Sequence, residues 1–126
     1  MTHLVDASFI LALMLGERVS PGSEELVDGS EISTVNISEI YRKLVDSGVP
    51  LANAVAETNR FRLRPIAFDE AQAVEAARLR PLTKHCGTSF ADRACLALAG
   101  LKNLPVYTAD RIWAELDLGL DIRMIR

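Results

Sequence analysis

The amino-acid sequence predicts an α/β protein, specifically a three-layer α/β/α sandwich with a mostly parallel central sheet. The chain has 126 residues, which is the size of one compact domain, so we expect a single domain over residues 1–126. Short β-branched segments alternate with longer segments of helical periodicity, as in parallel sheets that are covered by helices. Apolar residues make up 49% of the chain, the share expected of a globular protein.

Strands and helices are predicted by different spacings of the apolar residues. Short apolar runs rich in β-branched residues predict strands, whereas spacings of three and four predict helices, two of which end at Gly16 and Gly48. The predicted elements, in chain order, are a strand over His3–Val5, a helix over Ser8–Leu15, a loop over Ser20–Ser23, a strand over Glu31–Val35, a helix over Ile37–Val45, a helix over Leu51–Phe61, a strand over Leu63–Phe68, a helix over Asp69–Leu79, a loop over Thr83–Thr88, a helix over Phe90–Ala99, a strand over Leu104–Thr108, a helix over Arg111–Leu116 and a strand over Ile122–Ile125.

Four acidic residues stand at junctions between predicted strands and helices. Asp6 ends the first strand and Asp110 follows a later one, whereas Glu39 and Asp92 lie in the first turns of helices. Strand ends and the starts of the following helices share one edge of a parallel sheet, so the four carboxylates are expected to converge. Two unit charges 4 Å apart repel by about 4 kcal/mol at an effective dielectric constant of 20, which a divalent cation would relieve. An all-oxygen ligand set favours Mg²⁺ or Mn²⁺ over zinc.

Helix capping is the alternative role for each of these acids. Asp6 and Asp110 stand where N-cap residues accept hydrogen bonds from the first turn of a helix. Ser89 and Asp92 have the spacing of a capping box, and Asn36 and Glu39 have the same spacing. We expect Asn36 to cap its helix rather than to orient that acid. Capping does not require four acids to crowd at one sheet edge, whereas a divalent cation would relieve that crowding.

Four segments of the chain resemble, in order, the motifs of PIN-domain proteins, in particular those of VapC-type toxins of bacterial type II toxin–antitoxin systems. The resemblance covers residues 4 to about 125 and therefore nearly the whole chain. The segments are Val5-Asp6-Ala7-Ser8, Asn36-Ile37-Ser38-Glu39, Phe90-Ala91-Asp92 and Thr108-Ala109-Asp110-Arg111-Ile112-Trp113.

The resemblance implies a hydrolase: a metal-dependent endoribonuclease, the toxin of its pair, that cleaves RNA phosphodiester bonds with a metal-activated water. One or two Mg²⁺ or Mn²⁺ ions would be bound, and the products would carry a 5′-phosphate and a 3′-hydroxyl. Ser8 and Thr108 match accessory hydroxyl positions and would bind a metal-bound water or a phosphate. The residues that match the family's catalytic and metal-binding acids are Asp6, Glu39, Asp92 and Asp110.

RNA, a small cognate antitoxin and a second copy of the chain are the partners that the resemblance implies. The antitoxin would lay a helix in a hydrophobic groove. The apolar helix with Phe9, Ile10, Leu13 and Met14 is a candidate for part of that groove, with the dimer surface and the ordinary core as its alternatives. Arg93 and Arg111 each adjoin one of the four acids, so they would bind a substrate phosphate or pair with an acid. A further set of basic residues is expected on the solvated surface, where it could also flank the site: Arg60, Arg62, Arg64, Arg78, Arg80 and Lys84.

The sequence also predicts a cytoplasmic protein with no membrane partner. The longest apolar stretch, Phe9–Leu15, is too short to span a bilayer, and Met1–Leu4 lacks the basic segment of a secretory signal. Cys86 and Cys95 lie nine positions apart, which matches neither a zinc knuckle nor a redox pair. Cys95 falls on an apolar helical stripe, so we expect it in the core.

The charge of the chain bears on whether it binds RNA. A formal net charge of −3, from 14 basic and 17 acidic residues, by itself argues against a nucleic-acid binder. Without the four junction acids, 14 basic residues face 13 acidic ones, so those four account for the acidity. With two divalent ions bound, the formal charge becomes +1, and RNA binding is expected to depend on metal.

Three other functional classes fit the sequence less well than a nuclease does. A signalling receiver domain and a haloacid-dehalogenase-like phosphatase both need a second acid after the first strand, and Asp6-Ala7-Ser8 lacks it. A non-catalytic PIN-like module that binds protein or RNA is the main alternative. The complete set of four acids argues against that module, because buried carboxylates without a cation reduce stability and a pure binder has no use for them.

Overall fold

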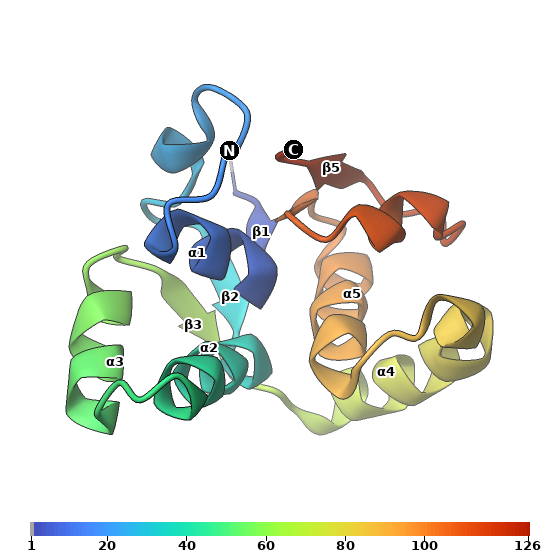
Figure 1. Ribbon diagram of the computed structural model, residues 1–126. Coiled ribbons are helices and arrows are strands. Elements are labelled where there is room, and N and C mark those ends of the chain that lie inside the picture. The colour runs from blue at the N-terminus through green and yellow to red at the C-terminus, as the bar shows by residue number, and fades with distance from the viewer. Residues whose placement is uncertain (1) are drawn as a thin grey trace.

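The computed structural model describes residues 2–126 and confirms the three-layer α/β/α sandwich (Figure 1). Within these residues, one five-stranded sheet has the order β3-β2-β1-β4-β5, and each neighbouring pair is parallel. The strands are β1 (Leu4–Val5), β2 (Glu31–Ser33), β3 (Arg64–Ile66), β4 (Val106–Thr108) and β5 (Ile122–Met124). The α-helices are α1 (Ala7–Met14), α2 (Thr34–Asp46), α3 (Leu51–Asn59), α4 (Glu70–Thr83) and α5 (Phe90–Lys102), and the 3-10 helices are η1 (Ser23–Leu26), η2 (Lys84–Cys86) and η3 (Arg111–Glu115).

The order of the strands places a crevice beside β1, at the centre of the sheet. The chain runs outward from β1 to β2 and β3, then returns to the other side of β1 with β4 and β5. The strand order therefore reverses between β1 and β4. In open parallel sheets, ligands bind at the carboxyl ends of the strands on either side of such a reversal.

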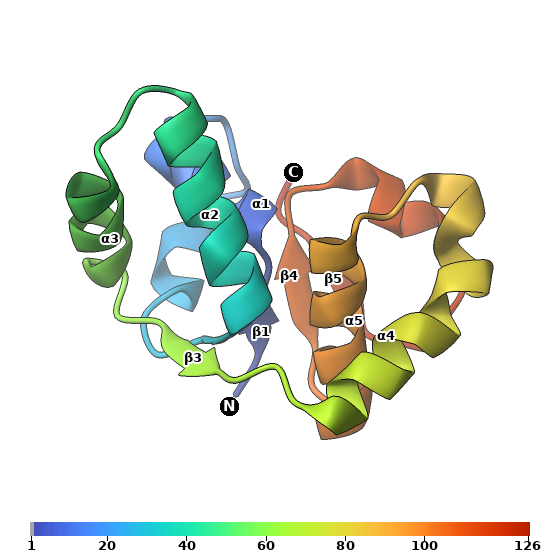
Figure 2. The same cartoon turned by 90° about the horizontal axis from the view of Figure 1, so that it is seen from below.

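The two faces of the sheet are covered by different helices (Figure 2). Leu4 and Val5 are both fully buried, and as neighbours in one strand they point to opposite faces. Val5 packs in the apolar cluster that includes residues of α1 and α2, such as Phe9 and Ile40. Leu4 packs with residues of α4 and α5 and with Trp113 of η3. The central strand is thus buried on both sides.

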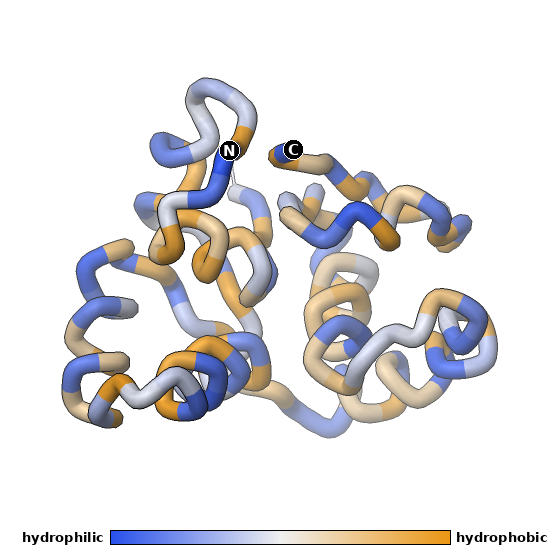
Figure 3. The backbone as a smooth tube through the Cα atoms, in the orientation of Figure 1, coloured by the Kyte–Doolittle hydropathy of each residue, from blue (hydrophilic) through white to orange (hydrophobic). Residues whose placement is uncertain are grey.

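Helix α5 is the most deeply buried helix element on its face. Residues 94–99 of this helix are all buried, including Cys95, as expected for a core cysteine. Figure 3 shows the α5 segment as apolar along most of its length. The polar first turn of α5, with Asp92, is the part that approaches the edge where β1 and β4 end. Within residues 2–126, no helix combines the length and the apolar character needed to cross a bilayer.

The predicted boundaries differ from the structure in a few places. β2 ends at Ser33, and the next two predicted strand residues begin α2, because the Ser33 hydroxyl accepts a hydrogen bond from the Val35 amide and caps the helix. α4 continues past Leu79 to Thr83, with Pro81 inside the helix. The 3-10 helix η1 follows the predicted Ser20–Ser23 loop, where no element was expected.

Candidate active site

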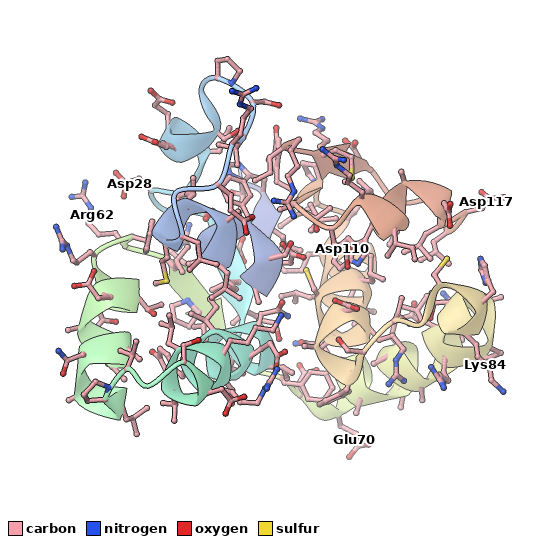
Figure 4. All side chains as sticks on the ribbon, viewed as in Figure 1. Asp28, Arg62, Glu70, Lys84, Asp110 and Asp117 are labelled. Atoms are coloured by element: carbon pink, nitrogen blue, oxygen red, sulfur yellow. The ribbon has the colours of Figure 1, made fainter. Side chains whose placement is uncertain are left out.

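The four acidic residues at the element junctions line the same pocket, which has a volume of about 310 Å³. Asp6 follows β1 and Asp110 follows β4, so they stand on either side of the reversal in strand order. Glu39 reaches the pocket from the second turn of α2 and Asp92 from the first turn of α5. Figure 4 places Asp110 near the middle of the molecule, above α5. The expected convergence at one sheet edge is therefore found.

Asp6 is held by hydrogen bonds from three directions. It is the N-cap of α1, as predicted, and its Oδ1 accepts from the Phe9 amide at 3.0 Å. The Ser8 hydroxyl lies 2.8 and 2.9 Å from the two carboxylate oxygens and donates to them. The Thr108 hydroxyl, on β4, donates to Oδ2 at 2.7 Å. These bonds fix the carboxylate of β1 against the end of β4.

The ionised form of Asp6 is disfavoured in spite of these donors. Only 2% of Asp6 is exposed, and this burial raises the pKa of its carboxyl from 3.8 to about 6. The hydrogen bonds from Thr108 and Ser8 lower the pKa by less than burial raises it, and the charge of Asp92 raises it further. A cation in the pocket would remove this penalty, because opposite charge favours the ionised form.

Asp92 and Asp110 also combine a capping role with a place in the pocket. Asp92 Oδ2 accepts from the Ser89 amide at 2.9 Å and the Asp92 amide donates to the Ser89 hydroxyl at 3.1 Å, which confirms the predicted capping box. Asp110 is the N-cap of η3, also as predicted. Partial burial raises the pKa of Asp92, and the nearby charge of Asp110 raises it as well. Capping and convergence therefore occur together.

Glu39 differs from the other three acids because it is paired with cations. Arg42 donates to both of its carboxylate oxygens, at 2.8 and 3.1 Å, and the Lys43 ammonium lies 3.9 Å away. The bonds from Arg42 lower the pKa of Glu39. Both cations line the acidic pocket, and neither was predicted as a site residue. Their spacing of three and four residues from Glu39 on one helix is the signal that would have found them.

Asn36 joins two helix starts instead of capping its own helix. The prediction that it caps α2 is wrong, since Ser33 occupies the N-cap and Asn36 lies inside the helix. The buried Asn36 side chain accepts a hydrogen bond from the Ala7 amide at 2.9 Å and donates to the Ala91 carbonyl at 3.0 Å. It thereby ties the starts of α1 and α5, which carry Asp6 and Asp92 on the wall of the pocket.

The donor chemistry of the pocket fits a hard divalent cation. Its acidic walls offer oxygen ligands only, and burial, with a smaller contribution from a neighbouring carboxylate, raises the pKa values of Asp6 and Asp92. Within residues 2–126, however, no three acidic, histidine or cysteine side chains are already arranged as a metal site. Glu39 is turned towards Arg42, and Asp92 is engaged by Ser89. An incoming ion would have to draw these side chains inward.

Ser8 and Thr108 act on Asp6 and on each other. Their hydroxyl oxygens are 3.1 Å apart. The Ser8 hydroxyl also accepts a hydrogen bond from the Ala109 amide, and the Thr108 hydroxyl accepts one from the Asp110 amide. Ser8 lines the pocket, whereas Thr108 is fully buried. The contacts of Thr108 therefore make it a support for Asp6 and Asp110 rather than a direct contact for a phosphate.

Replacing Thr108 with Val is expected to reduce the free energy of unfolding by about 2 kcal/mol, since buried polar groups lose their partners. If Asp6 is a metal ligand, RNA cleavage should also fall by about 10- to 100-fold, as for other residues that orient metal ligands. Thr58→Val is the matched control, because Thr58 is a buried threonine on α3 that does not line the acidic pocket. Its hydroxyl donates a hydrogen bond to the Ala54 carbonyl. Urea unfolding and cleavage rates check both effects, and equal cleavage by the two variants would contradict the role of Thr108.

The predicted basic residues lie away from the pocket walls. Arg93 donates to the Ser89 carbonyl at 3.3 Å, and Arg111 is exposed at the start of η3. Neither lines the acidic pocket. The set Arg60, Arg62, Arg64, Arg78, Arg80 and Lys84 does not line it either, and all six are exposed, as expected of solvated surface residues. Arg62 pairs with Asp28. Figure 4 shows Arg62 at one edge of the molecule and Lys84 at the opposite edge. The cations at the site are Arg42 and Lys43 instead.

A parallel sheet with an acidic, all-oxygen pocket at its reversal point is the framework of one known class of domain. The family model described as the PIN domain matches residues 3–118. The chain belongs to the PIN domain family, which confirms the resemblance of its four motifs. No curated protein matches the chain in sequence.

Several solved structures share the fold over essentially the full chain. VapBC2 from Rickettsia felis, bound to a DNA fragment from its promoter, has a TM-score of 0.78 at 13% identity and covers 100% of both chains. DNA-bound VapBC from Salmonella typhimurium has a TM-score of 0.74 at 19% identity, with 98% of each chain covered. Mycobacterium tuberculosis VapC20, a sarcin–ricin loop cleaving toxin, has a TM-score of 0.72 at 20% identity, with 98% of this chain and 99% of that chain covered. At these identities the likeness establishes the fold.

Proposed function

We propose that this chain is a Mg²⁺- or Mn²⁺-dependent endoribonuclease and the toxin component of a toxin–antitoxin pair. The observation that carries the proposal is the meeting of four carboxylates, from four separate chain segments, in one pocket at the reversal point of a PIN fold. Capping accounts for the local position of three of these acids, but it does not account for their shared pocket. The buried Asp6, whose pKa is raised to about 6, supports a pocket that takes up positive charge.

The chain's own side chains would divide the work as follows. Asp6, Glu39, Asp92 and Asp110 would hold one or two ions, while Ser8 and Thr108 keep the Asp6 carboxylate in place. A bound divalent ion would supply a coordinated water of lowered pKa and would polarise the scissile phosphate. Arg42 would lose its bonds to Glu39 when Glu39 turns to the ion and would keep its bond to Asp46 at 2.7 Å, so that its remaining N–H groups would face the phosphates of the substrate. Lys43 lies beside Glu39 and would contribute positive charge at the same place.

A small antitoxin is the proposed protein partner, as in the VapBC complexes that share the fold. The earlier expectation about its groove needs correction for Phe9 and Ile10, which are fully buried in the core, whereas Met14 lines a pocket with Leu44 and Phe61. Leu15 is 68% exposed and, with Leu11, lines a groove between α1 and α2 that also contains Lys43. We place the antitoxin contact there. The chain would act as a homodimer in the cytoplasm, where its RNA substrate is found.

Cleavage of structured RNAs with and without Mg²⁺ or Mn²⁺ tests the proposed function. We expect cuts that require the metal, that stop when a chelator is added, and that leave 5′-phosphate and 3′-hydroxyl ends. Sequencing the ends of a transcriptome-wide RNA pool would reveal cleavage at any site. An absence of cuts across that pool, with folded protein and millimolar Mn²⁺, would overturn the proposal in favour of a non-catalytic binding module.

A further inference from the structure

A second groove opens directly from the acidic pocket. It has a volume of about 570 Å³ and lies between the first three turns of α2 and the start of α5. Glu39, Arg42, Ser89 and Ala91 line both the groove and the acidic pocket, so the two spaces share a wall. A nucleotide whose phosphate lies at the acids carries its base only one sugar away. The adjoining groove is therefore within reach of that base.

An aromatic side chain that the nuclease chemistry does not use lies on the wall of this groove. Phe90, the first residue of α5, is 50% exposed although it is a large apolar residue. The ring of Phe68 meets it edge to face, with 5.4 Å between the centroids and an angle of 86° between the planes. This contact fixes the orientation of the Phe90 ring while half of the residue stays accessible. A fixed, accessible aromatic ring is what a nucleobase needs for stacking.

The surface of the groove is mainly apolar, and polar side chains of α2 line one side of it. Arg42 has a side chain that is 55% exposed and a planar guanidinium on the wall that both spaces share. Ser38 and Thr34 are exposed and supply hydroxyl groups along α2. Proteins recognise single-stranded RNA through such a combination of aromatic stacking, guanidinium planes and hydrogen bonds to base edges.

We infer that this groove is a nucleobase subsite, in which a base next to the scissile phosphate stacks on Phe90 and its edge is read from α2. The inference rests on the proposed function, since it places the base relative to a phosphate bound at the acids. It assigns to Phe90 a positioning role in the choice and orientation of the RNA. Ser38 and Thr34 are the side chains in reach to discriminate between bases.

Stopped-flow fluorescence with a single-stranded RNA that contains 2-aminopurine tests this subsite, because stacking on an aromatic ring quenches that base. Mixing with the Mn²⁺-loaded full-length chain is followed before cleavage occurs. Phe90→Leu keeps an apolar side chain but removes the ring, whereas Phe90→Tyr keeps the ring. We expect Phe90→Leu to bind about 10-fold more weakly and to lose the quench. Phe90→Tyr should bind and quench like the unaltered chain.

Leu82→Ala is the matched control, because Leu82 is 49% exposed on α4 and lines neither the groove nor the acidic pocket. It should leave binding and quenching unchanged. Thermal unfolding of each variant separates a lost stack from a lost fold. Binding and quenching by folded Phe90→Leu at the level of the unaltered chain would overturn the subsite, while metal-dependent cleavage would still support the nuclease. An unaltered chain that neither binds nor cuts RNA would overturn both.

Discussion

Replacing Asp6 with Asn is expected to lower the rate of metal-dependent RNA cleavage by about three orders of magnitude. A metal ion at a reacting phosphate supplies several kcal/mol of transition-state stabilisation, and each 1.36 kcal/mol is a factor of ten in rate. Asp6 is the most buried of the four acids, and it is held by Ser8, Thr108 and the Phe9 amide. Its loss therefore cannot be made good by a neighbouring side chain. Single-turnover cleavage of one RNA substrate measures the effect.

Asp117→Asn is the control for that substitution. It removes the same charge from an exposed residue at the edge of the molecule, far from Asp110 in Figure 4. We expect its cleavage rate to match that of the unaltered chain. Asp92→Asn should resemble Asp6→Asn, because both carboxylates line the pocket. Cleavage by Asp6→Asn at the rate of the Asp117→Asn control would show that the pocket is not the catalytic site.

The stability of the metal-free chain should fall as the pH rises from about 4 to above 6. The pKa of Asp6 is 3.8 for an ordinary aspartate and about 6 in the folded chain, so the folded state binds more protons in between. The stabilisation from protonated Asp6 is complete below pH 4 and is lost as the pH rises through 6. A difference of this size is worth about 3 kcal/mol at most. The raised pKa of Asp92 acts in the same direction, whereas the lowered pKa of Glu39 acts against it.

Comparison with Asp6→Asn isolates this contribution from the general effects of acid. The difference in unfolding free energy between the unaltered chain and Asp6→Asn, measured with a chelator present, should change by about 3 kcal/mol between pH 4 and pH 7. Adding Mn²⁺ at pH 7 should stabilise the unaltered chain, by about 2.7 kcal/mol at 100 times Kd, and should stabilise Asp6→Asn much less. Below pH 6 the protons compete, so the gain from Mn²⁺ should shrink. A pH-independent difference, or equal stabilisation by Mn²⁺, would contradict the metal site.

The sequence was sufficient to predict the parts of the site that depend on topology. Asp6 and Asp110 follow strands that must lie side by side if the sheet is parallel and reverses at its centre, so their convergence required no knowledge of side-chain contacts. The position of Asp92 at the same edge is predicted in the same way, because the start of α5 lies at the carboxyl ends of the strands. The capping box that Ser89 forms at the start of α5 was also predictable, because its hydrogen bonds join residues three positions apart.

The parts that depend on long-range contacts were not predictable. Asn36 bonds Ala7 and Ala91, which are 29 and 55 positions away, and nothing in its own helix indicates these partners. Some of the distant arginines are paired with acids away from the pocket, Arg78 with Glu75 on the same helix and Arg62 with Asp28. Arg42 and Lys43 line the pocket because they lie on the same side of α2 as Glu39.

Diffraction from crystals soaked in Mn²⁺ tests the shared metal site most directly, because the anomalous signal locates the ion without any assumption about activity. We expect one or two manganese peaks in the acidic pocket, with oxygens of Asp6 and of at least two of Glu39, Asp92 and Asp110 about 2.0–2.2 Å away. In that structure Glu39 should have left Arg42. Manganese peaks elsewhere on the molecule, with none in the pocket and Glu39 still bound to Arg42, would contradict the shared metal site.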